Sequence, residues 1–143
     1  MVGAAMMGFL SALHYWWPKM FGRMYPERFA LVTASAVFVG FVVTFTPQFL
    51  LGNMGMLRRY GEYPPRFQVL NVISTAGSWA LASGLAATVA YLAWSLVKGE
   101  RAPGNPWGSR GFEWMTPSPP PTHNYDVTPV ITHRPHNYHE PES

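Results

Sequence analysis

Residues 29–57 read FALVTASAVFVGFVVTFTPQFLLGNMGML, and residues 67–97 read FQVLNVISTAGSWALASGLAATVAYLAWSLV. Neither stretch contains Asp, Glu, Lys or Arg, so the 10 basic and 7 acidic residues of the 143-residue chain all lie elsewhere. A lipid bilayer excludes charge over about 20 consecutive residues, whereas a soluble domain distributes charge along its helices. The two stretches therefore predict membrane-spanning helices in an all-α transmembrane protein.

Three apolar segments predict helices at about 1–17, 28–51 and 68–97, which together form a transmembrane segment over residues 1–98. The first of them is uncharged but has only 17 residues, close to the short limit for a span, so we expect a truncated span there. Residues 99–143 are polar and contain nine prolines, which exclude long helices. This Pro-rich tail is expected to be extended against a partner or disordered.

Small residues gather on the third predicted helix, mainly Ser, Ala and Gly between residues 74 and 87. Such residues allow helices to approach closely in lipid, and Gly40 offers the same on the second helix. Three spans alone leave much of this small-residue face uncovered. We therefore expect the chain to belong to a larger membrane assembly.

Basic residues between the spans predict the orientation. Three of them lie between the first two spans and three at the start of the tail, against three in the middle loop. By the positive-inside bias, the tail is cytoplasmic and the middle loop lies outside. In chain order the three groups are Lys19, Arg23 and Arg28; Arg58, Arg59 and Arg66; and Lys98, Arg101 and Arg110.

Composition excludes several classes of function. The chain has no cysteine, so it has neither disulfides nor thiolate metal sites. Its net charge of +3 forms no basic surface of the kind that binds nucleic acid. No Gly-rich phosphate loop, pair of intramembrane carboxylates or Ser/His/Asp grouping is found. The chain does not carry a complete active site of its own, which leaves its standing as an enzyme uncertain.

The adjacent residues Arg58 and Arg59 are the main candidate site. Neighbouring guanidinium groups repel each other unless anions lie close by, and each can bind a carboxylate or phosphate through two hydrogen bonds. Two readings remain open on spacing alone: binding of lipid headgroups, or binding of a buried anionic group of a cofactor. Glu62 is a further candidate partner for the pair.

Histidines give weaker candidates. His14 lies in the first apolar segment, where an ionisable residue is a functional candidate, although packing near a helix end explains it more simply than metal ligation. A His-rich tract in the tail has the composition of a divalent-metal site, but nothing nearby holds it rigid, so a solvated tail is the simpler interpretation. Its members are His123, His133, His136 and His139.

Four segments resemble, in order, the C-terminal part of cytochrome c oxidase subunit I, a haem–copper oxidase. LHYWWPKMFGRMY (13–25) is similar to the end of that family's tenth helix. TFTPQFLLGNMGMLRRY (44–60) is similar to the eleventh helix and its following loop, and residues 63–71 continue the match. FEWMTPSPPPTHNY (112–125) resembles the family's tail.

The resemblance implies a role for the arginine pair. In the family, a pair matching Arg58 and Arg59 binds haem propionates on the outer side of the membrane. The family's haem iron ligands precede the segment similar to Val2-Gly3, and its copper ligands lie in earlier helices. The complete enzyme is thus expected to hold a-type haem and copper, with none of the metals ligated by this chain. Leu57 replaces the family's usual proline, and Thr46 its usual phenylalanine.

By the same resemblance, the chain is the last quarter of the catalytic subunit of a terminal respiratory oxidase. That enzyme oxidises cytochrome c, reduces oxygen to water and translocates protons. Its expected partners are the remaining helices of subunit I, subunits II and III, cytochrome c and membrane lipid, in a bacterial inner membrane. The chain is expected to be inactive alone. Two alternatives stay open: a separately encoded subunit of a split oxidase, and a non-catalytic scaffold or assembly protein derived from one.

Overall fold

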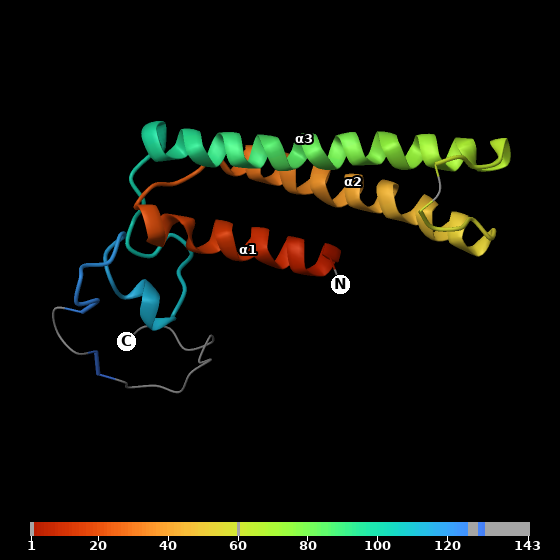
Figure 1. Ribbon diagram of the computed structural model, residues 1–143. Helices are drawn as coiled ribbons and strands as arrows, with labels where there is room; N and C mark the ends of the chain where they lie inside the picture. Colours follow the sequence, from red (N-terminus) through yellow and green to blue (C-terminus); the bar gives the residue numbers. More distant parts are fainter. Residues whose placement is uncertain (1, 60, 126–128, 131–143) are drawn as a thin grey trace. The chain divides into compact units, whose positions relative to one another are not determined.

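The computed structural model describes residues 2–59, 61–125, 129 and 130, and this part of the chain is built from helices (Figure 1). The long ones are α1 (Val2–Phe21), α2 (Glu27–Asn53) and α3 (Gln68–Lys98). Two short 3₁₀ turns, η1 (Pro65–Phe67) and η2 (Phe112–Trp114), complete the set. No strand occurs among the described residues, so the predicted all-α class is confirmed.

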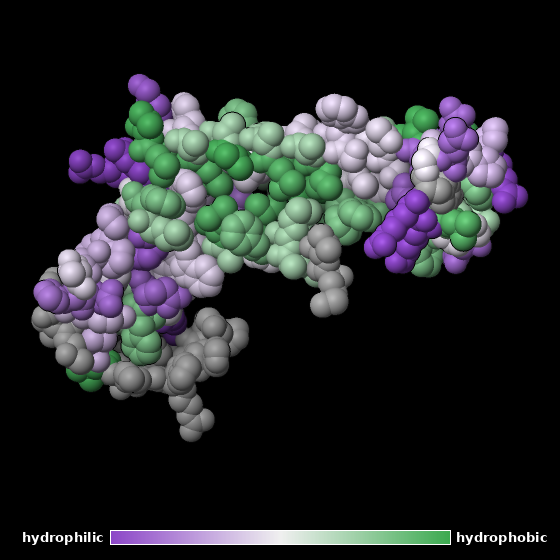
Figure 2. Space-filling model, viewed as in Figure 1, coloured by the Kyte–Doolittle hydropathy of each residue, from purple (hydrophilic) through white to green (hydrophobic). Residues whose placement is uncertain are grey.

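Two of the helices are long and apolar enough to cross a membrane: Glu27–Asn53, and Pro65–Lys98 if η1 is counted with α3. Only 17% and 28% of the residues in their most apolar stretches are buried, so most of their apolar side chains face outward. Figure 2 shows this apolar surface along the middle of the α2–α3 pair, with hydrophilic residues at the end where a loop connects the two helices. This is the distribution that a bilayer requires. The expected first span is not one of the two, although α1 is a helix of 20 residues.

Helix α2 and most of α3 form an antiparallel pair within one compact unit, Pro26–Ala93. Glycines bring the two backbones together. A Cβ atom on Gly40 would lie 2.5 Å from the Leu81 nitrogen, and one on Gly77 would lie 2.6 Å from the Thr44 nitrogen. Close contact of this kind drives helix association in lipid, where the hydrophobic effect between helices is absent.

The small-residue face of α3 is therefore divided. Ser74, Gly77, Gly84 and Thr88 are buried in this unit, so α2 covers part of the face. Ala80 is partly buried, and the other small residues remain exposed within the described structure. They are Thr75, Ala76, Ser78, Ala82, Ser83, Ala86 and Ala87.

The second unit joins Val2–Tyr25 to the described residues from Trp94 onward, so this grouping of residues differs from a division at residue 98. In it, the segment after α3 folds back onto the end of α1. Lys19, which was expected in the loop between the first two spans, is a buried residue of α1 and is only 6% exposed. Trp114 of η2 is 3% exposed. The first part of the tail is thus ordered against α1 of its own chain.

Two helices extend beyond their expected ends. Helix α1 continues through Pro18 to Phe21, and α2 continues through Pro47 to Asn53. Proline removes one backbone hydrogen bond but does not always end a helix, because neighbouring helices can supply compensating packing in a membrane. Both prolines are buried, which is consistent with that explanation.

Candidate functional site

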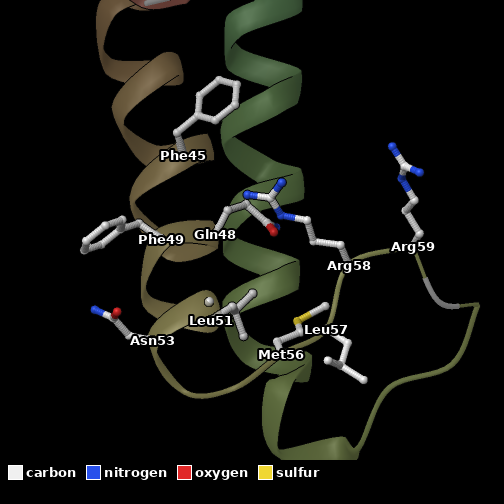
Figure 3. A pocket seen from close by; sticks show the side chains of 10 residues that line it. Phe45, Gln48, Phe49, Leu51, Asn53, Met56, Leu57, Arg58 and Arg59 are labelled. Carbon is white, nitrogen blue, oxygen red and sulfur yellow. The ribbon is translucent and has the colours of Figure 1, made fainter.

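A hollow of about 600 Å³ lies where α2 ends and the following loop begins, and it contains both candidate arginines (Figure 3). Helix α2 contributes apolar and polar side chains to its wall, and the loop contributes two apolar residues and the two arginines. The lining residues are Phe45, Gln48, Phe49, Leu51, Gly52, Asn53, Met56, Leu57, Arg58 and Arg59.

Arg58 and Arg59 differ in direction. Figure 3 shows the Arg58 side chain directed back along α2 toward Gln48, while the Arg59 side chain points away from it. Both residues are exposed. Within the described residues neither guanidinium forms an ion pair, and Glu62, the expected candidate partner, does not pair with them. The donors of both groups are therefore available to an anion.

The loop backbone produces this divergence. Helix α2 ends in turns closed by bonds from Met54 N to Leu50 O (3.0 Å) and from Met56 N to Leu51 O (3.0 Å). Arg59 then adopts a left-handed conformation with φ 63°. For a residue with a side chain this conformation costs roughly 1–2 kcal/mol. The chain bends at Arg58 and Arg59, and the two side chains leave this bend in different directions.

A polar network holds α2 to α3 beside the hollow. Gln48 donates through Nε2 to Ser74 Oγ (3.0 Å) and to Asn71 Oδ1 (3.3 Å). Ser74 donates to the Thr44 carbonyl (2.8 Å), and Asn71 donates to the Phe67 carbonyl (3.0 Å). The hydrogen bonds fix one wall of the hollow to both helices.

The residues at the hollow fit the anionic edge of a haem better than a metal ion. Arginines supply hydrogen-bond donors for carboxylates, and Phe45 and Phe49 supply aromatic surface. In contrast, the described residues hold no cluster of three or more His, Cys, Asp or Glu side chains able to bind a metal. The hollow is thus suited to the carboxylates of a large apolar ligand.

The histidines lie apart from this site. His14 bonds through Nδ1 to the Leu10 carbonyl at 2.6 Å, and its ring packs edge-on against Tyr25 with centroids 5.0 Å apart. These contacts are those of a packing residue within α1. His123 is exposed, and His133, His136 and His139 lie outside the described residues.

Two apolar helices, joined by a loop that exposes two adjacent arginines, define an integral membrane protein. Comparison with known proteins specifies which one. The family described as "Cytochrome C and Quinol oxidase polypeptide I" matches residues 1–80. The chain belongs to this family, the subunit I of haem–copper oxidases.

Individual relatives agree with that assignment. The chain is 42% identical over 132 residues to the "Heme-copper oxidase subunit I+III" of Aeropyrum pernix, covering 92% of this chain and 16% of that protein. It is 40% identical over 136 residues to "Cytochrome c oxidase subunit 1" of Synechocystis, covering 95% of this chain and 25% of the relative. It is 40% identical over 133 residues to the protein of the same name from Bacillus sp. PS3, covering 91% and 22%. The chain thus spans a quarter or less of the length of these relatives.

Sequence reasoning identified the arginines but missed their surroundings. Gln48 and Asn71 were noticed only as part of matching segments, and Ser74 only as a small residue. A signal was nevertheless present, since polar residues in apolar spans usually pair with one another. Their partners could not be assigned without the relative register of α2 and α3.

Proposed function

We propose that this chain forms part of the catalytic subunit of a terminal respiratory oxidase and contributes Arg58 and Arg59 as the groups that bind haem propionates. One observation carries the proposal: the two guanidinium groups line a hollow that also contains aromatic side chains, and neither has an ion-pair partner in the described structure. Membership of the haem–copper oxidase family supplies the ligand that fits them.

The arginines act by charge. A guanidinium beside a propionate neutralises that carboxylate, which otherwise favours the oxidised state of the iron through space. The pair therefore raises the haem midpoint potential and fixes the edge of the ring. Bound haem and copper supply electron transfer and oxygen reduction. Helix α2, packed against α3, contributes the wall of the hollow beside the two arginines.

Within this proposal, electrons come from cytochrome c, protons are translocated, and the tail lies in the cytoplasm of a bacterial cell. The remaining helices of subunit I and subunits II and III are the partners. Small and apolar side chains of α2 and α3 are exposed in the described structure, which supports assembly with further helices. In the proposal, the partners cover these side chains. The metal ligands come from those other helices.

The test uses the assembled oxidase that contains this chain. We expect Arg58→Ala with Arg59→Ala to lower a haem midpoint potential, measured by spectroelectrochemical titration, while the subunit still inserts. Arg66→Ala is the matched control, because Arg66 lies in the same connection between α2 and α3 but does not line the hollow. Its guanidinium carbon lies 4.6 Å from the centroid of the Phe67 ring. Potentials equal to those of the control variant would remove the propionate role.

A further inference from the structure

The orientation of the Gln48 amide follows from its hydrogen bonds. The Phe67 carbonyl can only accept, so Asn71 must present its Nδ2 there, at 3.0 Å, and turn Oδ1 toward Gln48. Oδ1 also only accepts, so Gln48 must present Nε2 to it, at 3.3 Å. Ser74 has its one proton on the Thr44 carbonyl and accepts from the same Nε2 at 3.0 Å.

Both protons of the Gln48 amide are thus used by α3, which leaves its carbonyl oxygen as an acceptor at the wall of the hollow. Within the described residues no donor is bonded to this Oε1. Arg58 lines the same hollow, and Figure 3 shows its guanidinium directed toward Gln48. A guanidinium has five N–H donors and no acceptor, so the fixed oxygen and the arginine are complementary.

We propose that Gln48 is a positioning residue for Arg58: its amide, clamped by Ser74 and Asn71, presents Oε1 to the guanidinium and sets the direction in which the remaining N–H groups meet an anion. The inference rests on the proposed function, because the anion in question is the haem propionate. Arg59, which points away from Gln48, does not depend on it.

Preorganisation gives Gln48 its effect. A flexible arginine loses side-chain freedom when it binds an anion, and an arginine that donates to a fixed acceptor as it binds has fewer orientations to lose. The neutral amide also leaves the positive charge of Arg58 intact for the propionate. A carboxylate in its place would compete for the guanidinium.

The experiment is a double-mutant cycle in the haem-loaded oxidase, read by haem midpoint potential and by the width of the haem absorption bands. Gln48→Met keeps the length of the side chain and removes the acceptor. Gln68→Met is the matched control, since Gln68 is an exposed glutamine outside the hollow. We expect Gln48→Met to lower the potential by part of the Arg58→Ala shift, and to have no further effect when Arg58 is already alanine.

The outcomes separate the two claims. If Arg58→Ala lowers the potential but Gln48→Met behaves as Gln68→Met does, the Gln48 inference is wrong and the propionate role stands. An equal Gln48→Met shift with and without Arg58 also overturns the inference. If Arg58→Ala changes nothing, the proposed function fails. Should Gln48→Met not assemble, Ser74→Ala loosens the same amide, and a wild-type potential in that variant contradicts the inference.

Discussion

The Lys19 ammonium nitrogen lies 2.6 Å from the carbonyl oxygen of Thr116, a residue 97 positions later in the chain. It also donates to the carbonyls of Gly104 (2.9 Å) and Pro117 (3.3 Å), and it lies 5.0 Å from the centroid of the Trp114 ring. A lysine is rarely buried unless its donors are satisfied, and here backbone carbonyls satisfy them. The contact joins the end of α1 to the first part of the tail.

Lys19→Met tests this junction. The substitution keeps the apolar stem but leaves the carbonyls without their donor, and hydrogen bonds to charged groups contribute about 1.5–3 kcal/mol. We expect the segment 104–118 to become protease-sensitive while α2 and α3 are unaffected. Limited proteolysis followed by mass spectrometry measures the change. Lys98→Met replaces an exposed lysine, and this variant should be cleaved to the same extent as the wild type. Equal cleavage of segment 104–118 in the two variants would contradict the role of Lys19.

Ser95→Ala tests the contact between α1 and the end of α3. Trp17 donates its indole N–H to Ser95 Oγ at 2.9 Å, and Ser95 is fully buried. Removing the hydroxyl leaves a buried donor unsatisfied, which costs about 1–3 kcal/mol. We expect a lower midpoint of thermal unfolding in detergent and a changed Trp fluorescence spectrum. Ser83→Ala removes an exposed hydroxyl of the same helix and should leave both observables unaltered.

Gly40→Ala tests the close crossing of α2 and α3. The added methyl group would meet Leu81 backbone atoms, which cannot rotate away as a side chain can. Overpacking of this kind costs about 1–3 kcal/mol or more and pushes the helices apart. We expect reduced assembly of the oxidase, measured as haem per subunit after purification. Gly8→Ala, where a Cβ atom meets nothing within 4 Å, should assemble normally; the idea fails if the two variants assemble equally well.

Much of this structure could be predicted from the sequence, because lipid imposes a simple rule on it. The two charge-free stretches predicted α2 and α3, and Gly40 was expected to allow close helix approach. The tail was harder. Its prolines indicated extended or disordered chain, while the order near Lys19 depends on contacts with residues about 100 positions away, which no local pattern encodes.

The site shows the same limit. A pair of adjacent arginines can be read directly from the sequence, so Arg58 and Arg59 were identified. The family resemblance then suggested a ligand for them. Gln48 was not identified, since its role depends on Ser74 and Asn71, which lie on another helix. The left-handed φ of 63° at Arg59 could not be predicted either, because a residue with a side chain rarely adopts that conformation.

An experimental structure of the assembled, haem-loaded oxidase tests most directly whether Arg58 and Arg59 bind haem carboxylates. The account predicts a haem propionate oxygen within about 3 Å of an Arg58 or Arg59 guanidinium nitrogen, with the ring edge against the hollow. Propionates bound by other groups, with a lipid phosphate on the arginine pair, would contradict it.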